Sequence, residues 1–157
     1  MWKMLMLCCV LGCAPSASDL QTQATTALRS MQYDKALELS EQALALADAQ
    51  ADAVLAWQLQ QVRLEAMARK GQGSQVKTTL EQLSQRYPAQ VGSTQYLTMG
   101  TLVQQAGDAT GAIDLFAEGD KRFPDESAAF KTAMDAIKNK AGSDSAEIEK
   151  LKALGYL

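Results

Sequence analysis

The chain contains no histidine, and its three cysteines, Cys8, Cys9 and Cys13, all lie within the first thirteen of 157 residues. Without an imidazole, the sequence cannot build a Ser-His-Asp or Cys-His catalytic site, a histidine-containing zinc site or a histidine-based pH switch. No later cysteine can pair with the first three, so a disulfide framework is their weakest interpretation. The composition therefore favours binding over catalysis, and we expect no catalytic residue, no metal and no cofactor.

Proline and β-branched apolar residues are also scarce. Three prolines and nine valines and isoleucines stand against 26 alanines and 20 leucines, a balance that favours helices over strands. The length is about that of one domain, and the 47% hydrophobic residues, 21% charged residues and formal net charge of −3 are typical of a soluble domain. We therefore predict one all-α domain.

The first twelve residues have the layout of a secretory signal peptide. Lys3 is followed by an uninterrupted apolar run from Met4 to Leu11 and then by the small residue Gly12. This run of eight residues is too short to span a bilayer core, which requires about 20. We therefore expect residues 1–12 to be an export signal and not a transmembrane helix.

The end of this segment, Val10-Leu11-Gly12-Cys13, resembles the lipobox of bacterial lipoproteins. The resemblance implies cleavage before Cys13 and attachment of acyl chains to it, with residues 13–18 as a lipidated tether. Ala14 is compatible with sorting to the outer membrane, facing the periplasm. The alternatives are an ordinary cleaved signal peptide or a wrongly assigned start codon, with Cys13 an incidental thiol. Loss of Lys3 would leave 14 basic and 18 acidic residues, a net charge of −4, which does not favour nucleic acid as a partner.

Two stretches of the remaining chain, Gly71–Pro88 and Gly107–Pro124, can be aligned with an offset of 36 residues. Each begins with a glycine that can end a helix, continues with apolar residues at helical spacing, and closes on Arg-aromatic-Pro. Met31–Asp48 is an earlier copy at an offset of 40. Self-similarity with this period predicts stacked helical hairpins.

Nine residues in the last of these hairpins resemble the tetratricopeptide repeat (TPR) family in type and spacing. The resemblance implies a TPR-like α-solenoid of about three hairpins over residues 19–141 and a C-terminal capping helix over residues 142–157. The small residues Gly100 and Ala112 should lie where the two helices of a hairpin cross, with larger side chains filling the space between layers. The nine residues are Tyr96, Met99, Gly100, Val103, Gly107, Asp108, Ala112, Phe116 and Pro124.

We expect eight helices, whose boundaries are predicted from capping side chains and from glycines that can adopt a left-handed conformation. The helices should span about residues 19–31, 34–48, 52–70, 74–86, 92–106, 109–122, 125–140 and 144–154. The expected N-caps are Asp19, Asp34, Asp52, Ser74, Asp108, Asp125 and Asp144, and the expected C-terminal glycines are Gly71, Gly107, Gly142 and Gly155. Ile148, Leu151 and Leu154 share one face of the last helix, which should cover the end of the solenoid.

In TPR-like solenoids the first helices of successive hairpins line a concave groove, and the resemblance carries this role to their outward side chains. Amides and hydroxyls can hydrogen-bond to an extended backbone, so an uncharged peptide or a polar glycan is a better match than an acidic tail. The same side chains are also ordinary solvated surface, and this alternative stays open. The groove residues are Gln58, Gln61, Glu65, Arg69, Thr94, Thr98, Thr101, Gln105, Lys131 and Asp135, with Gln21, Thr25, Arg29 and Lys138 towards the two ends.

Trp57, near the start of the long third helix, allows two interpretations: an exposed anchor for a partner, or packing against the first hairpin, which we favour. The sequence as a whole predicts a non-catalytic, lipid-anchored TPR adaptor that binds a protein or peptide partner in a bacterial cell-envelope assembly. One alternative is an accessory protein that positions a glycan or peptidoglycan substrate for a separate enzyme. Another is a structural spacer that oligomerises through its own groove.

Overall fold

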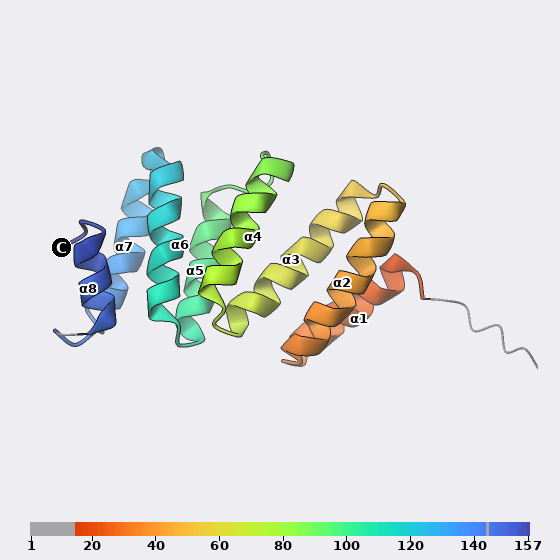
Figure 1. The fold of residues 1–157 in the computed structure, drawn as a ribbon, viewed down its shortest axis with the longest axis horizontal. Coiled ribbons are helices and arrows are strands. Elements are labelled where there is room, and N and C mark those ends of the chain that lie inside the picture. Colours follow the sequence, from red (N-terminus) through yellow and green to blue (C-terminus); the bar gives the residue numbers. More distant parts are fainter. Residues whose placement is uncertain (1–14, 144) are drawn as a thin grey trace, which may run out of the picture.

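The computed structural model describes residues 15–143 and 145–157, which form eight α-helices, one short 3₁₀ turn (η1, Pro124–Glu126) and no strand. The helices are stacked one after another along the long axis of the molecule (Figure 1). The fold of the described residues is therefore an all-α helical repeat solenoid, as predicted. The helices are α1 (Ala17–Arg29), α2 (Tyr33–Ala49), α3 (Ala53–Arg69), α4 (Gly73–Arg86), α5 (Ser93–Gln105), α6 (Ala109–Arg122), α7 (Ser127–Lys138) and α8 (Ala146–Ala153).

Each observed helix matches a predicted one within two residues at both ends, and the start of α1 shows why some boundaries moved. The Ser16 hydroxyl accepts a hydrogen bond from the Asp19 amide (3.1 Å), and the Asp19 carboxylate accepts one from the Ser16 amide (3.1 Å). This reciprocal capping box makes Ser16, and not Asp19, the N-cap. Residues 16–18, which we assigned to the tether, are therefore the cap and first turn of α1.

Two of the predicted aspartate caps are confirmed. The Asp52 carboxylate accepts from the Leu55 amide (3.0 Å), and that of Asp108 accepts from the Gly111 amide (2.8 Å). Each satisfies a first-turn amide that has no partner within its helix. The other predictions differ: Asp34 and Ser74 lie inside the first turns of α2 and α4, Asp125 lies in η1, and Ser145 caps α8, whereas Asp144 lies outside the described residues.

Left-handed backbone ends several helices, as predicted, but not always at glycine. Gly71, Gly107 and Gly155 have φ angles of 70°, 95° and 80°, whereas Gly142 is not left-handed. Met31 (58°) and Ala51 (54°) have the same conformation although a Cβ atom makes it unfavourable. Met31 lies in the α1–α2 turn, at the place that glycine occupies in the α3–α4 and α5–α6 turns.

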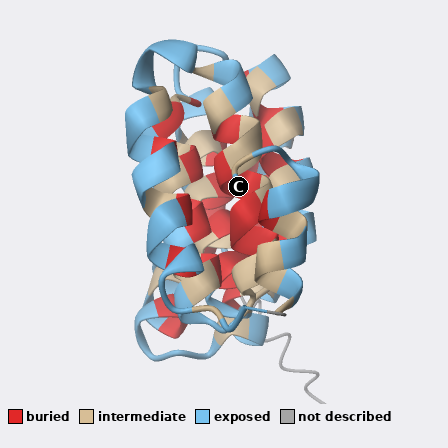
Figure 2. Ribbon diagram, turned by 90° about the vertical axis from the view of Figure 1, so that its left-hand side faces the viewer, coloured by how far each residue is buried: buried red, intermediate tan, exposed pale blue. Residues whose placement is uncertain are grey.

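The odd-numbered helices form one continuous layer, because α1 contacts α3, α3 contacts α5 and α5 contacts α7. In the second layer α4, α6 and α8 follow one another, while α2 packs on α1 and α3. The buried residues lie between the helices, and the outer faces are exposed (Figure 2). None of the described helices is both long enough and apolar enough to span a membrane.

The core consists of two apolar clusters that meet at α3. One contains mainly alanine and leucine from α1, α2 and one face of α3. The other extends from another face of α3 to α8 and contains the buried aromatic side chains. Leu37 of α2 packs against both clusters. Because α3 contributes to both, its orientation determines how the two parts of the solenoid are joined.

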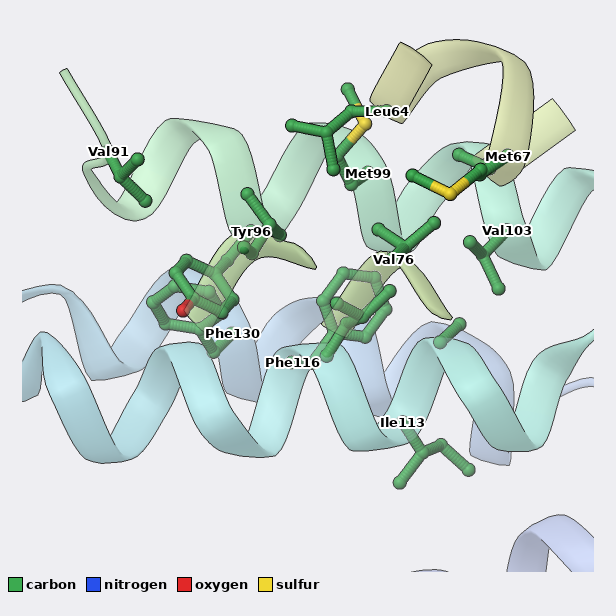
Figure 3. Packing of buried hydrophobic residues seen from close by; sticks show 14 of the residues in the cluster. Leu64, Met67, Val76, Val91, Tyr96, Met99, Val103, Ile113, Phe116 and Phe130 are labelled. Atoms are coloured by element: carbon green, nitrogen blue, oxygen red, sulfur yellow. The ribbon is translucent and has the colours of Figure 1, made fainter. Parts of the chain in front are cut away.

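Two helical glycines allow aromatic rings to lie against the backbone. A Cβ atom at Gly100 would overlap with the ring of Phe116, and one at Gly119 would overlap with the ring of Phe130. Both rings are fully buried in the larger cluster, as is Tyr96 (Figure 3). The predicted need for a small residue at position 100 is confirmed, whereas the same role of Gly119 was not predicted.

A regular series of hydrogen bonds joins the second helices of successive hairpins near their C-terminal ends. The acceptors are Asp48, Ser84 and Asp120, spaced by 36 residues, and the donors are Arg86 (2.7 Å), Arg122 (2.8 Å) and Tyr156 (2.6 Å), respectively. Tyr156, in the C-terminal tail, therefore has the donor role that Arg86 and Arg122 have earlier in the series. Hydrogen bonds at one repeat spacing are what a solenoid of nearest-neighbour contacts requires.

The C-terminal helix covers the end of the solenoid, because α8 packs against α6 and α7. Leu151 is buried, as predicted, and Ile148 is half-buried. The prediction is wrong for Leu154, which is 44% exposed. Lys150 extends back to Asp114 of α6 (2.5 Å), so polar contacts as well as apolar ones hold α8 in place.

Candidate binding clefts

The ten predicted groove residues lie on the odd-numbered layer, as expected, but seven of them are distributed over three separate clefts and the other three line none of these. Gln61, Glu65 and Arg69 line a cleft between α1 and α3, together with Thr25 and Arg29. Thr101 and Gln105 line a second between α5 and α7. Lys131 and Asp135, with Lys138, line a third between α7 and the C-terminal tail.

The α1–α3 cleft has a volume of about 390 Å³ and brings together five of the predicted residues. It also contains an apolar part that the sequence did not indicate, formed by Leu28, Met31, Tyr33 and Val62. The side chain of Met31 is 75% exposed, the largest exposure among the large apolar residues of the described chain. The cleft therefore combines solvent-facing apolar surface with charged and amide groups.

The two arginines of this cleft have different surroundings. The Arg69 guanidinium donates to the Glu65 carboxylate through Nε (2.8 Å), and Nη2 lies 2.8 Å from the same oxygen. This hydrogen bond raises the pKa of Arg69 and neutralises its charge locally. Arg29 has no carboxylate within 4 Å among residues 15–143 and 145–157. The Nε2 atom of Gln61 is buried and has no acceptor.

The α5–α7 cleft is larger, about 640 Å³, and mostly uncharged where α5 contributes. Gln104 lines it beside Thr101 and Gln105, while Lys140 and Glu147 lie on its other side. The Thr101 hydroxyl donates to the Leu97 carbonyl (2.8 Å) within its own helix, so it presents only acceptor capacity to a ligand. Amide side chains are the main hydrogen-bonding groups available here.

The α7–tail cleft is the smallest of the three, about 220 Å³. Lys131, Asp135 and Lys138 supply its charges, and Met134, Leu151 and Tyr156 its apolar lining. Its volume is below the range of about 300–1,000 Å³ that is typical of ligand sites.

Three predicted groove residues, Gln58, Thr94 and Thr98, are exposed but line none of these clefts. The Gln58 amide oxygen instead accepts from the Gln21 side-chain amide of α1 (2.7 Å). This contact joins two side chains that we had assigned to ligand binding and uses part of their hydrogen-bonding capacity. Helical position correctly predicted the layer of these residues, but not their neighbours.

Trp57 does not pack against the first hairpin, so the interpretation that we favoured is wrong. Its ring lies 5.4 Å from that of Tyr87, centroid to centroid, and it packs against the larger apolar cluster. The Arg86 guanidinium lies over the Tyr87 ring, 5.3 Å from its centroid. These three side chains connect the start of α3 with the end of α4. The Arg-aromatic-Pro pattern at position 87 was the signal that could have indicated Tyr87 as a packing partner.

Three carboxyl groups, those of Asp19, Asp120 and Glu147, have a pKa below its usual value and so stay ionised near neutral pH. Burial opposes ionisation of Asp120, but hydrogen bonds from Ser127 and Tyr156 lower its pKa overall. Hydrogen bonds also lower the pKa of Asp19 and of Glu147. Within residues 15–143 and 145–157, no group of three or more acidic, cysteine or histidine side chains is placed to hold a metal ion.

Comparison of the chain with protein-family models, curated proteins and solved structures finds no match. The assignment of a function therefore depends on the residues and clefts of this chain.

Proposed function

We propose that the protein is a non-catalytic, lipid-anchored adaptor of the TPR type that binds a protein partner on its odd-numbered helix layer. The observation that carries the proposal is the repetition of clefts along one layer, between α1 and α3 and again between α5 and α7. Both lie within the typical volume range of ligand sites, and both include amide and hydroxyl side chains in their lining. A solenoid with repeated clefts on one face is suited to a partner that extends along it.

Membrane attachment through Cys13 is the second part of the proposal, and the cysteine itself lies outside the described residues. Support comes from the lipobox-like sequence, and the early start of α1 sets the length of the linker. Only Ala14 and Pro15 separate Cys13 from the N-cap Ser16, so about 10 Å of extended chain would join the lipid to the domain. The proposed location is the bacterial envelope, at the periplasmic side of the outer membrane, with the solenoid held close to the bilayer.

Metabolic labelling with a palmitate analogue tests the anchor. The wild-type chain and Cys9→Ala should be labelled, because Cys9 would be removed with the signal, whereas Cys13→Ala should not. Equal labelling of Cys13→Ala and wild type would exclude the anchor.

Site-specific photo-crosslinking in intact cells tests the adaptor role. A photoreactive residue at Gln105, in the α5–α7 cleft, should give one defined protein adduct, and one at Gln82, exposed on α4, should not. The same adduct from both positions would show that the odd-numbered layer is not the binding surface.

Glycan positioning is the second candidate, and the uncharged α5 side of the α5–α7 cleft favours it. The Gln104 and Gln105 amides can both donate to and accept from sugar hydroxyls, and the Thr101 hydroxyl can accept from them. Retention of the chain on insoluble peptidoglycan, lost in Gln104→Ala with Gln105→Ala, would support this function in place of the adaptor. If the double variant is retained on peptidoglycan as well as the wild type is, glycan binding in this cleft is excluded.

A further inference from the structure

We propose that the α1–α3 cleft binds an acidic peptide segment in which a carboxylate side chain lies next to a large apolar one. The inference rests on the proposed function and specifies the partner class of one cleft. It also revises the expectation, drawn from side-chain type alone, that the groove prefers an uncharged ligand. Three independent features of the cleft support it: its free donors, its local charge and the conformation of Met31.

The first feature is that the cleft holds donors without acceptors. The Arg29 guanidinium has no carboxylate within 4 Å in the described part of the chain, and the buried Gln61 Nε2 has no hydrogen-bond partner. The carboxylate of the cleft, Glu65, is already paired with Arg69. A ligand that supplies an acceptor therefore pairs with the exposed Arg29 guanidinium, whereas the buried Gln61 amide would first have to turn towards the cleft. A carboxylate does so best, because hydrogen bonds between ionised groups are the stronger ones.

The second feature is the positive charge of the residues that line this cleft and the one beside it. A shallower cleft beside the first shares Met31 and Tyr33 with it and adds Lys35, Lys70 and Asp34 to the surface. Lys70 is paired with Asp34. The two clefts together contain four basic residues and two acidic ones, a net charge of +2 in a chain with a net charge of −3. An acidic segment is attracted to this surface while the rest of the protein repels it.

The third feature explains why the ligand needs an apolar side chain. Met31 occupies a left-handed position, which the equivalent turns of the second and third hairpins fill with Gly71 and Gly107. An L residue is unfavourable there, and the conformation directs an apolar side chain into solvent at the edge of the cleft. Methionine adapts its shape to varied apolar surfaces, a property common at binding surfaces. Leu28 and Val62 continue the apolar surface within the cleft.

These features also distinguish a peptide from other anionic ligands. A nucleic acid requires a row of free cations, whereas two of the four basic residues here are paired with carboxylates. A small inorganic anion would not need Met31. An acidic and apolar peptide uses both parts of the cleft.

The test measures fluorescence anisotropy of labelled, capped octapeptides with the full-length chain in detergent micelles. The peptide of alternating Asp and Leu (Asp–Leu) should bind most tightly. The comparison peptides, which alternate Asn with Leu, Lys with Leu, or Asp with Ser, should bind more weakly. Arg29→Gln should weaken binding of the Asp–Leu peptide about tenfold, the loss expected for a charge-assisted hydrogen bond. Lys121→Gln is the matched control, because Lys121 is also exposed and without a carboxylate within 4 Å among the described residues, but lies on α6 outside the cleft.

Met31→Gly separates binding from folding. The change should weaken binding of the Asp–Leu peptide several-fold and leave binding of the Asp–Ser peptide unchanged. Glycine relieves the strain of the left-handed backbone at position 31, so the melting temperature of the variant should not fall. Weaker binding can then not be attributed to unfolding.

Four outcomes would overturn the proposal: equal binding of the Lys–Leu peptide, equal weakening by Lys121→Gln, no effect of Arg29→Gln, or a labelled oligonucleotide that binds more tightly than the Asp–Leu peptide. Photo-crosslinking from position 25 shows whether only the acidic-peptide proposal fails or the adaptor function fails as well. A defined protein adduct from Thr25 without binding of the acidic peptide would reject the partner class and retain the adaptor. The absence of an adduct from both Thr25 and Gln105 would reject the adaptor itself.

Discussion

The hydroxyl of Tyr156 donates to the carboxylate of Asp120 at 2.6 Å, 36 residues earlier in the chain. Arg86 and Arg122 make the corresponding contacts to Asp48 and Ser84 in the preceding repeats. The C-terminal tail thus continues, with a neutral donor, a series that arginines form elsewhere. Exposed ion pairs contribute little to stability, whereas the half-buried Tyr156–Asp120 pair is less screened by solvent.

We predict that Tyr156→Phe lowers the free energy of unfolding by about 1 kcal/mol at pH 7, the value of one hydrogen bond to a partly exposed charged group. Tyr156 contributes to the lowered pKa of Asp120, so its stabilising effect is present at neutral pH and decreases as the pH falls below about 3.8. The Tyr156 phenol has the opposite pH dependence. Burial is the main cause, and the hydrogen bond to Asp120 a smaller one, of a pKa raised to about 12. The stabilisation by Tyr156 is therefore lost as the pH rises from 10 to 12.

Urea denaturation of wild type and Tyr156→Phe at pH 7 and pH 2.5 measures this prediction. The difference between the two proteins should be largest at pH 7. A difference that grows at pH 2.5 would contradict the assigned role of the Asp120 carboxylate.

Tyr96→Phe should have the opposite effect, although the substitution is the same. The Tyr96 hydroxyl is buried without a hydrogen-bond partner, and burial raises its pKa to about 12. Removal of an unsatisfied buried hydroxyl should increase the free energy of unfolding by about 1 kcal/mol. The ring contacts with Phe123 would remain. Urea denaturation beside Tyr156→Phe provides the comparison, and a loss of stability in Tyr96→Phe would reveal a partner for the hydroxyl, such as a buried water.

The sequence predicted the helices well because their boundaries are encoded locally. Gly71, Gly107 and Pro124 end or begin helices for reasons of backbone conformation, which neighbouring residues hardly change. The caps were predicted less accurately, since Ser16 and Asp19 can each act as a cap and only the reciprocal geometry distinguishes them. Met31 and Ala51 could not be predicted as left-handed residues, because the local preference of both is against that conformation.

The candidate clefts were predictable only in part. Helical spacing placed Gln61, Arg69 and Thr101 on the correct layer, but a cleft also depends on the distance and tilt between helices. The α3 helix is shared by two apolar clusters, and its orientation decides that Trp57 meets Tyr87 and that Arg29 lies beside Gln61. Such contacts join residues about 30 apart in sequence, and no local pattern specifies them.

Gly119→Ala should destabilise the protein by about 1–3 kcal/mol through overpacking, despite the higher helix propensity of alanine. A methyl group there would overlap with the ring of Phe130, which is fully buried and cannot move away freely. Gly142→Ala is the matched control, because nothing lies within 4 Å of its Cβ position. Thermal denaturation by circular dichroism should show a lower melting temperature for Gly119→Ala alone. Equal melting temperatures would mean that Phe130 has room to shift.

Ala51→Gly should raise the stability, and Gly107→Ala should lower it, each by about 1 kcal/mol or less. Both positions are left-handed, with φ angles of 54° and 95°. Glycine removes the steric penalty of the Cβ atom, and the larger entropy of the unfolded glycine chain offsets part of this gain. The two melting temperatures should therefore shift in opposite directions from that of the wild type. A lower melting temperature for Ala51→Gly would contradict the strain assigned to Ala51, and a higher one for Gly107→Ala would contradict the left-handed conformation of Gly107.

The contact between Trp57 and Tyr87 predicts a fluorescence signal for the junction of α3 and α4. In a Trp2→Phe background Trp57 is the single tryptophan, and its half-buried ring lies 5.4 Å from Tyr87. Tyr87→Ala should shift the emission maximum to longer wavelength, because loss of the ring exposes the indole to water, while helicity is largely retained. Leu28→Ala, in the other apolar cluster, is the control and should leave the emission maximum of the folded state unchanged. A red shift from Leu28→Ala but not from Tyr87→Ala would place Trp57 against the first hairpin after all, and the α3–α4 junction would then lack the aromatic contact that joins its two helices.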